Sequence, residues 1–204
     1  ENNIIQRIPT NYYMYYNYGA GLYLNNSNLY MTNTVVQNNA FLSNASYTRY
    51  GIGLYVSSGN VYITDSTISY NHGVNRSSSY QRGAGMYYSG SGYVIQITNS
   101  TLSNNYNTYY GGGLCIDGSN NTINILDSTF KNNTYAYYGG GLYVNGTGNT
   151  INILDSIFEN NTDTYYGAAI CINSDSNNYN NILNITNSTI HNNSALSAGG
   201  GLYF

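Results

Sequence analysis

The chain contains 204 residues, only 6% of them are charged, and the formal net charge is −3 at pH 7. Five basic residues over this length do not make the basic patch that phosphate recognition requires, which argues against nucleic acid as a partner. No apolar run approaches the ~18 residues of a membrane-spanning helix, so no transmembrane segment is expected.

A glycine-rich motif recurs along the chain at intervals of 28 or 32 residues. Six of the seven copies consist of three small residues and one apolar residue, as in 111–114, and the copy at 51–54 has Ile52 at the second position. A fixed period of this size is typical of a stacked repeat architecture. The copies begin at Gly19, Gly51, Gly83, Gly111, Gly139, Gly167 and Gly199.

Each glycine motif predicts a short strand. Its apolar residues, such as Leu114 and Ile116, are expected to point inward, and the residue between them outward. Small residues at positions 112, 140, 168 and 200 are expected to leave room inside for Phe130 and Phe158. The outward residues form a stacked column of Tyr23, Tyr55, Tyr87, Cys115, Tyr143, Cys171 and Tyr203.

Three further features follow in every period. A polar turn leads into a strand of alternating apolar and polar residues, in which Ile123 and Ile125 face the core. An acidic or amide residue then precedes a hydroxyl residue, as in Asp127 and Ser128. The period closes with an apolar residue and an asparagine three positions later, as in 130–133.

The recurring asparagine predicts a hydrogen-bonded ladder inside the turns. Its side-chain amide both donates and accepts, and it tolerates turn conformations, so stacked copies can bond to each other and to buried backbone. Loss of one member is expected to cost on the order of 1–3 kcal/mol. The ladder comprises Asn39, Asn71, Asn105, Asn133, Asn161 and Asn193.

No segment holds apolar residues at helical spacing, and each period supplies about three short strands joined by turns. Such strands bury their apolar faces only by stacking coil upon coil. We therefore predict an all-β fold, a right-handed parallel β-helix of about seven rungs with 28–32 residues in each rung. One solenoid domain is expected over 1–204, with a partial first rung in 1–18 and a partial last rung in 199–204.

The two motifs resemble the repeats of polymorphic outer-membrane-protein passenger domains, and more loosely the wider class of right-handed β-helix surface proteins. A glycine-rich segment alternates there with Phe-x-x-Asn, which residues 130–133 and 158–161 match. The resemblance covers about residues 8–204. It implies a β-helical protein of the cell surface, although fold does not dictate function.

A polysaccharide-active enzyme is the alternative that a β-helix raises. Asp65, Asp127 and Asp155 share one position of the repeat. Asp127 and Asp155 would approach within about 5 Å, which suits acid–base chemistry or a cation. Asparagine occupies the same position in the other copies, which favours a turn-capping role. No basic residue recurs beside this position, so we expect no catalytic residues, no metal site and no cofactor.

The two cysteines, Cys115 and Cys171, occupy equivalent positions two rungs apart. Their Cα atoms should lie about 9.6 Å apart, beyond the ~7 Å reach of a disulfide, so free thiols are expected.

Tyrosine pairs at 109–110, 137–138 and 165–166 precede three consecutive glycine motifs. They are expected to stack as an aromatic stripe along one edge. Ring stacking is a sufficient structural reason for the stripe, and contact with glycans or neighbouring subunits is the alternative.

A surface so poor in charge would associate unless sugars keep it soluble. Asn-x-Ser/Thr sequons that fall in predicted turns or long loops are candidates for N-glycosylation if the protein is secreted. They are Asn25, Asn44, Asn75, Asn120 and Asn145.

The two ends of the chain complement each other, since 199–204 begins a rung and 8–11 fits the end of one. Open sheet edges pair with other strands, and a head-to-tail contact that does not close produces a filament. We therefore expect a non-enzymatic, extracellular structural protein, the protomer of a glycosylated homopolymeric fibre. Part of a larger β-helix adhesin is the alternative. Self-association is expected to involve Ile8, Asn11, Gly199, Gly200, Gly201, Leu202, Tyr203 and Phe204.

Overall fold

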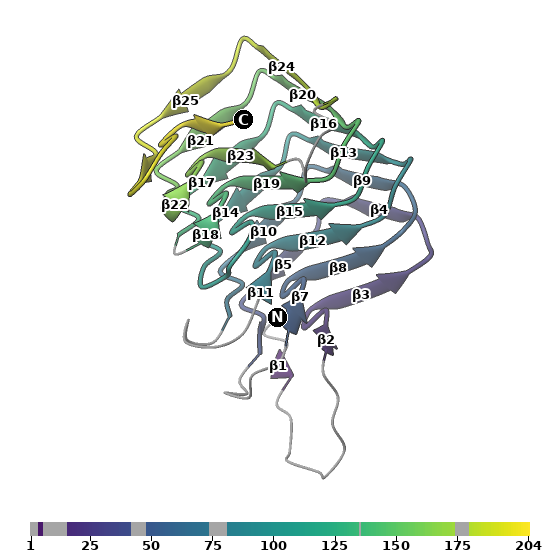
Figure 1. Cartoon of the computed structure of the whole chain (residues 1–204). Helices are drawn as coiled ribbons and strands as arrows, with labels where there is room; N and C mark the ends of the chain where they lie inside the picture. The colour runs from purple at the N-terminus through teal and green to yellow at the C-terminus, as the bar shows by residue number, and fades with distance from the viewer. Residues whose placement is uncertain (1–3, 6–15, 42–47, 74–80, 135, 174–179) are drawn as a thin grey trace.

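A computed structural model describes residues 4–5, 16–41, 48–73, 81–134, 136–173 and 180–204. Every strand pairing within these ranges is parallel, and no helix occurs in them. Figure 1 shows the coils lying one above another, from the purple N-terminal part to the yellow C-terminal part. The predicted parallel β-helix is therefore confirmed.

The glycine motifs open the strands of a seven-stranded sheet, which we call the glycine sheet, in the order β27-β23-β19-β15-β12-β8-β3. Equivalent residues of the repeat lie directly opposite each other, so that Leu114 pairs with Leu142 and Cys115 with Tyr143. The strands are β3 (Leu22–Asn25), β8 (Leu54–Ser57), β12 (Met86–Ser89), β15 (Leu114–Asp117), β19 (Leu142–Asn145), β23 (Ile170–Asn173) and β27 (Leu202–Tyr203).

The alternating segments form a six-stranded sheet in the order β24-β20-β16-β13-β9-β4. Burial alternates along each inner strand, as the period-2 pattern predicts. The strands are β4 (Leu29–Thr32), β9 (Val61–Thr64), β13 (Val94–Thr98), β16 (Thr122–Leu126), β20 (Thr150–Leu154) and β24 (Ile182–Thr186).

The apolar residues before the repeated asparagines form a second six-stranded sheet, in the order β25-β21-β17-β14-β10-β5. Its strands are short because a turn follows each one at once. They are β5 (Val35–Gln37), β10 (Thr67–Ser69), β14 (Thr101–Ser103), β17 (Thr129–Lys131), β21 (Ile157–Glu159) and β25 (Thr189–His191).

Further strands precede the glycine motifs and form two three-stranded sheets, β11-β7-β2 and β18-β22-β26. A further pair, β1-β6, lies near the N-terminal end. The strands are β1 (Ile4–Ile5), β2 (Tyr16–Tyr18), β6 (Ala40–Phe41), β7 (Thr48–Tyr50), β11 (Gln81–Arg82), β18 (Ala136–Tyr138), β22 (Thr162–Tyr166) and β26 (Ser194–Ala195).

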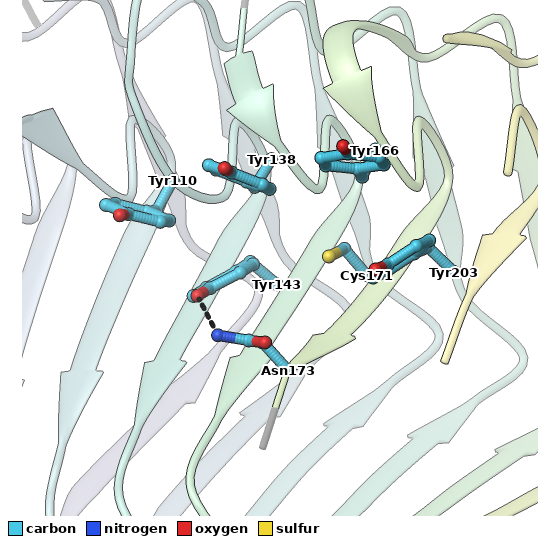
Figure 2. Close-up of a pocket in the computed structure, with 7 residues that line it drawn as sticks. All are labelled: Tyr110, Tyr138, Tyr143, Tyr166, Cys171, Asn173 and Tyr203. Carbon is cyan, nitrogen blue, oxygen red and sulfur yellow. Dashed lines mark hydrogen bonds between the residues drawn. The ribbon is translucent and has the colours of Figure 1, made fainter. Parts of the chain in front are cut away.

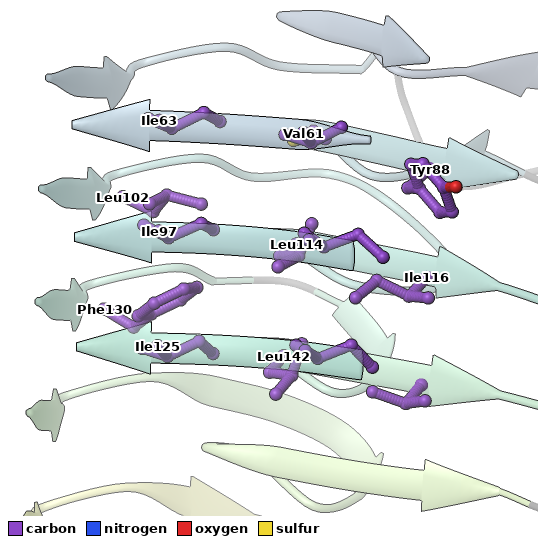
Figure 3. Close-up of a cluster of buried hydrophobic side chains, with 14 of the residues drawn as sticks. Val61, Ile63, Tyr88, Ile97, Leu102, Leu114, Ile116, Ile125, Phe130 and Leu142 are labelled. Carbon is purple, nitrogen blue, oxygen red and sulfur yellow. The ribbon is translucent and has the colours of Figure 1, made fainter. Parts of the chain in front are cut away.

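The three long sheets enclose one apolar core that runs through the coils. Figure 3 shows Ile63, Ile97 and Ile125 one above another on successive strands, and all three side chains are fully buried. Phe130 and Phe158 stack with ring centroids 4.7 Å apart. Each large side chain buried in this way contributes about 1.5–3 kcal/mol, so stacking stabilises strands that are too short to stand alone.

The number of complete rungs is slightly lower than the seven expected. Among the described residues, the glycine sheet has seven strands but the two other long sheets have six each. The last repeat thus contributes only β27 to the three long sheets in the described part of the chain.

The first glycine of the motif adopts a left-handed backbone conformation, with φ of +61° at Gly111. A side chain there would also collide with the carbonyl oxygen of Leu114, 2.6 Å from an added Cβ, so both strain and space require glycine.

The third small residue, rather than the second, makes room for the phenylalanines. A Cβ added to Gly113 or Gly141 would meet the ring of Phe130 at 3.3 Å or Phe158 at 3.2 Å. The prediction for positions 112, 140, 168 and 200 was therefore wrong. Residues at the second position of the motif do not face the main core. Three of them, Ala20, Ile52 and Ala84, form a separate buried cluster with Phe41.

Candidate functional site

The six repeated asparagines lie in one column behind the glycine motifs. From Asn39 to Asn161, each Nδ2 donates to the Oδ1 of the next asparagine, at 3.0 Å from Asn133 to Asn161. The same Oδ1 accepts the backbone N–H of Asn133 at 3.1 Å. A second donation from Asn133 Nδ2 reaches the carbonyl of Leu102 at 3.0 Å. The same pattern links the rest of the column, Asn39, Asn71, Asn105, Asn161 and Asn193.

Two parallel ladders were not foreseen from the sequence. The hydroxyl residues form one, in which the N–H of Ser128 donates to Ser156 Oγ at 3.1 Å. Asparagines of the polar turn form the other, in which the N–H of Asn121 donates to Asn149 Oδ1 at 3.0 Å. The serine and the turn asparagine each recur at a fixed position of the repeat, so the sequence contained the signal for both ladders. In all three ladders a side-chain oxygen accepts a hydrogen bond from a backbone N–H group of a turn, which would otherwise be buried without a partner.

The Asp column lies in turns with left-handed backbone, with φ of 50° at Asp65, 49° at Asp127 and 50° at Asp155. Asn99 Nδ2 donates to Asp65 Oδ1 at 2.6 Å, and Asn187 donates likewise to Asp155. This geometry is the turn role that the exchange of Asp and Asn predicts. The described residues contain no group of three or more His, Cys, Asp or Glu side chains that could hold a metal.

The tyrosine pairs stack into two rows, as the stripe predicts. Tyr109, Tyr137 and Tyr165 form one row, with ring centroids 4.5 Å and 4.0 Å apart. The second residue of each pair forms the other row, with Tyr110 and Tyr138 5.4 Å apart.

From Tyr55 to Cys171 the outward column of the glycine sheet is buried and forms a second core, whereas Tyr23 and Tyr203 at its two ends are exposed. Tyr87 and Tyr143 are only 4% and 3% exposed. Residues of the strands that precede the glycine motifs cover them, Tyr110 and Tyr138 among them. We call the outward residues of the glycine sheet the inner column and the covering residues the outer column. The outer column consists of Tyr18, Tyr50, Arg82, Tyr110, Tyr138, Tyr166 and Ala198.

Tyrosine is replaced at two positions in each column. In the inner column the exceptions are Cys115 and Cys171, both free and buried, which confirms the expectation of free thiols. In the outer column they are Arg82 and Ala198.

The gap above Cys115 is closed by the chain itself. The Arg82 guanidinium lies 4.9 Å from the centre of the Tyr110 ring and forms an ion pair with Asp117. Tyr87 also donates its hydroxyl to Asp117, at 3.1 Å. The Tyr110 ring leans onto Tyr143, 4.8 Å away. A charged network thus fills the first gap, and Cys115 is fully buried.

The gap above Cys171 remains open as a cavity of about 230 Å³. Figure 2 shows Cys171 between Tyr143 and Tyr203, with Asn173 at one side and Tyr138 and Tyr166 opposite. Asn173 Nδ2 donates to the Tyr143 hydroxyl at 3.4 Å. The sequence signal for this cavity is the cysteine at 171, where the inner column otherwise has tyrosine on both neighbouring rungs.

Burial shifts the pKa values of the tyrosine and cysteine side chains in the second core. It raises the pKa of the Tyr143 and Tyr87 phenols and of the Cys115 thiol well above their ordinary values. Burial also raises the pKa of Tyr88 in the main core. These groups are therefore neutral near neutral pH, and the fully buried Cys115 thiol is unsuited to act as a nucleophile.

The glycosylation candidates fall in different surroundings. Asn25 and Asn120 are exposed. Asn145 is half-buried, and its Nδ2 donates to Asp117 Oδ1 at 3.0 Å. Asn44 and Asn75 lie outside the described residues.

The self-association candidates lie at one end of the described structure. Leu202, Tyr203 and Phe204 are 39%, 38% and 67% exposed, and 199–201 are half-buried. Ile8 and Asn11 lie outside the described residues. Across the described ranges there is no helix with the length and apolarity to cross a membrane.

Comparison with known families yields one match. Residues 155–173 match the Chlamydia polymorphic membrane protein repeat. This chain is a β-helix repeat protein similar to those repeats. The matched repeat runs from the turn at Asp155 through Phe158 and Asn161 to the glycine strand, and it has alanine at 169, where most copies have glycine.

The similarity to the polymorphic membrane protein repeat gives coarse support for a cell-surface protein. The searches of curated proteins and of solved structures each returned no significant match.

Proposed function

We propose that this protein is a non-enzymatic structural protein of a cell surface, and that its β-helix extends head to tail through further copies into a fibre. The observation that supports this proposal is the contrast between the last rung and the interior rungs. Leu202 is 39% exposed, whereas Leu142 at the same repeat position is 0% exposed. Ile185 is 38% exposed against 1% for Ile153.

The first described rung shows the same contrast, because Leu22 is 38% exposed and Leu54, its neighbour in the sheet, is 0% exposed. At both ends the glycine strand therefore carries an apolar residue that a further rung covers in the interior, whereas Leu29 and Met31 of the first rung are already 7% and 5% exposed. Strands at such edges also have unpaired backbone groups, which favour addition of a parallel strand. Contact between the two different ends is heterologous and does not close, so it propagates.

Negative-stain microscopy and size-exclusion chromatography with light scattering, at micromolar concentration, test the fibre. We expect rods longer than one protomer, and we expect Leu202→Asp to shorten or abolish them. Leu154→Asp is the matched control, since Leu154 is also 39% exposed but lies on the side of an interior rung. A monodisperse monomer for the unchanged chain would contradict the proposal.

The second candidate is part of a larger β-helix surface adhesin, in which further rungs of the same polypeptide cover these ends. The match of one repeat to a membrane protein family favours it. A stable monomer in the experiment above, with no effect of Leu202→Asp on assembly, is its expected outcome.

We further propose that N-linked glycans on exposed turns supply the solubility that the 6% charged residues do not. Asn25 and Asn120 are the sites that their exposure favours. Asn145 is disfavoured because its amide nitrogen already donates to Asp117.

A further inference from the structure

We propose that the cavity above Cys171 is a binding site for one neutral sugar ring, a terminal hexose unit of an uncharged glycan. This inference deepens the proposed surface role by naming a ligand class, and it does not depend on fibre formation. It starts from the place of the cavity, which lies where the inner column lacks a tyrosine, at Cys171.

The shape of the cavity suits one ring. Tyr143 and Tyr203 flank Cys171 in the inner column, so they lie two rungs, or about 9.6 Å, apart. The ring that tyrosine would place between them is absent. The cavity of about 230 Å³ is smaller than the ~300–1,000 Å³ of sites for drug-sized ligands, which favours a single ring.

The filled gap at Cys115 shows which groups these columns can hold in such a space. There the flat guanidinium of Arg82 lies over a tyrosine ring while its edge bonds to Asp117. Two rungs further on, the residues at the positions of Arg82 and Asp117 are Tyr138 and Asn173. The second gap thus keeps the aromatic wall and the polar edge but has lost both charges.

The lining determines the class of ligand. Among the described residues it consists of tyrosine side chains, the Cys171 thiol and the Asn173 amide, with no charged group. A charged ligand would lose hydration there without a counter-charge, which disfavours it. A purely aromatic ring would stack on the tyrosines but would form no hydrogen bond with the Asn173 amide or with the phenolic hydroxyls. A neutral sugar satisfies both, because its C–H face packs on aromatic rings and its hydroxyls bond to Asn173 and to tyrosine hydroxyls.

Saturation-transfer NMR with a panel of neutral hexoses and their disaccharides, built from glucose, galactose, mannose and N-acetylglucosamine, tests this site on the whole chain. We expect at least one sugar to bind with a Kd on the order of 1 mM, the range for a single ring. Cys171→Tyr restores the missing ring, fills the cavity and should weaken binding at least tenfold.

Cys171→Ser keeps the cavity and is the matched control, with binding expected within about twofold of the unchanged chain. Asn173→Ala provides a second variant that removes the polar edge without filling the cavity, so it tests the site even if Cys171→Tyr does not fold. It should weaken binding about threefold to tenfold.

Three outcomes would overturn the inference. One is that no neutral sugar binds. Another is that binding persists unchanged in both a folded Cys171→Tyr variant and Asn173→Ala. The third is that p-cresol or glucuronate binds where every neutral sugar fails, which would assign the cavity to an aromatic or an anionic ligand. None of these results changes the rod length expected by microscopy, so the fibre proposal is tested independently of the sugar site.

Discussion

At the scale of single residues, the repeated asparagine explains why the turns can be buried. Asn133 has both side-chain polar atoms bonded, and it is 0% exposed. The amide is the one side-chain group of this size that donates twice and accepts twice, which is what a stacked column of identical residues needs.

Replacement of Asn133 by alanine should destabilise the fold by at least about 1–3 kcal/mol, because it leaves buried partners on both neighbouring rungs unsatisfied. Urea unfolding followed by circular dichroism measures the loss. Asn124→Ala is the control, since Asn124 lies on the outer face of β16 in the same repeat and is half-buried. Equal unfolding midpoints for the two variants would remove the ladder from the account of stability.

Tyr143 should make the fold sensitive to alkaline pH. Burial raises its pKa above the ordinary value of 10.0, so above that pH the unfolded chain releases a proton that the folded chain keeps. Stability from this phenol is therefore complete below about pH 10 and is lost as the pH rises further.

Urea midpoints between about pH 8 and pH 11 should fall at the upper end, and Tyr143→Phe should make the fall less steep by up to about 1.4 kcal/mol per pH unit. A slope identical to that of the unchanged chain would show that Tyr143 ionises freely in the folded state.

At the scale of the strand, stability comes from identical positions stacked in register. Phe130 on β17 lies against Phe158 on β21, and each is fully buried. Gly113 and Gly141 of the glycine motifs have no side chain, so the two rings pack directly against the backbone there.

Phe130→Ala should therefore leave a cavity that this stiff backbone cannot close, at a cost of about 3–5 kcal/mol. Ile157→Ala on the next rung should cost less than about 1 kcal/mol, because that side chain points outward and is 40% exposed. Thermal unfolding of the two variants measures the difference, and a comparable loss in both would contradict the assignment of the core face.

At the scale of the whole molecule, a surface with so few charges depends on other polar groups for solubility. Glycopeptide mass spectrometry of protein isolated from its natural surface should find sugars on Asn25 and Asn120 and none on Asn145. The exposure of the first two asparagines and the bonded amide of the third are the physical reason. Unmodified peptides at both exposed sites would end this proposal.

The sequence alone determined the architecture. A period of 28 or 32 residues, a strand with period-2 burial and a recurring asparagine each depend only on near neighbours and on copies of themselves. Parallel stacking then follows, because it is the arrangement that buries every copy of the apolar face and pairs every copy of the asparagine.

Only the tertiary structure decided how one column covers another. Tyrosine pairs precede three of the glycine motifs, but nothing in the local sequence places Tyr138 or Arg82 over the glycine sheet. Their contacts join different rungs, as between Arg82 and Asp117, and depend on how each covering ring tilts. The open cavity lies where the inner column has Cys171 in place of a tyrosine and where tyrosines of the outer column line the space, which depends on how the two columns align.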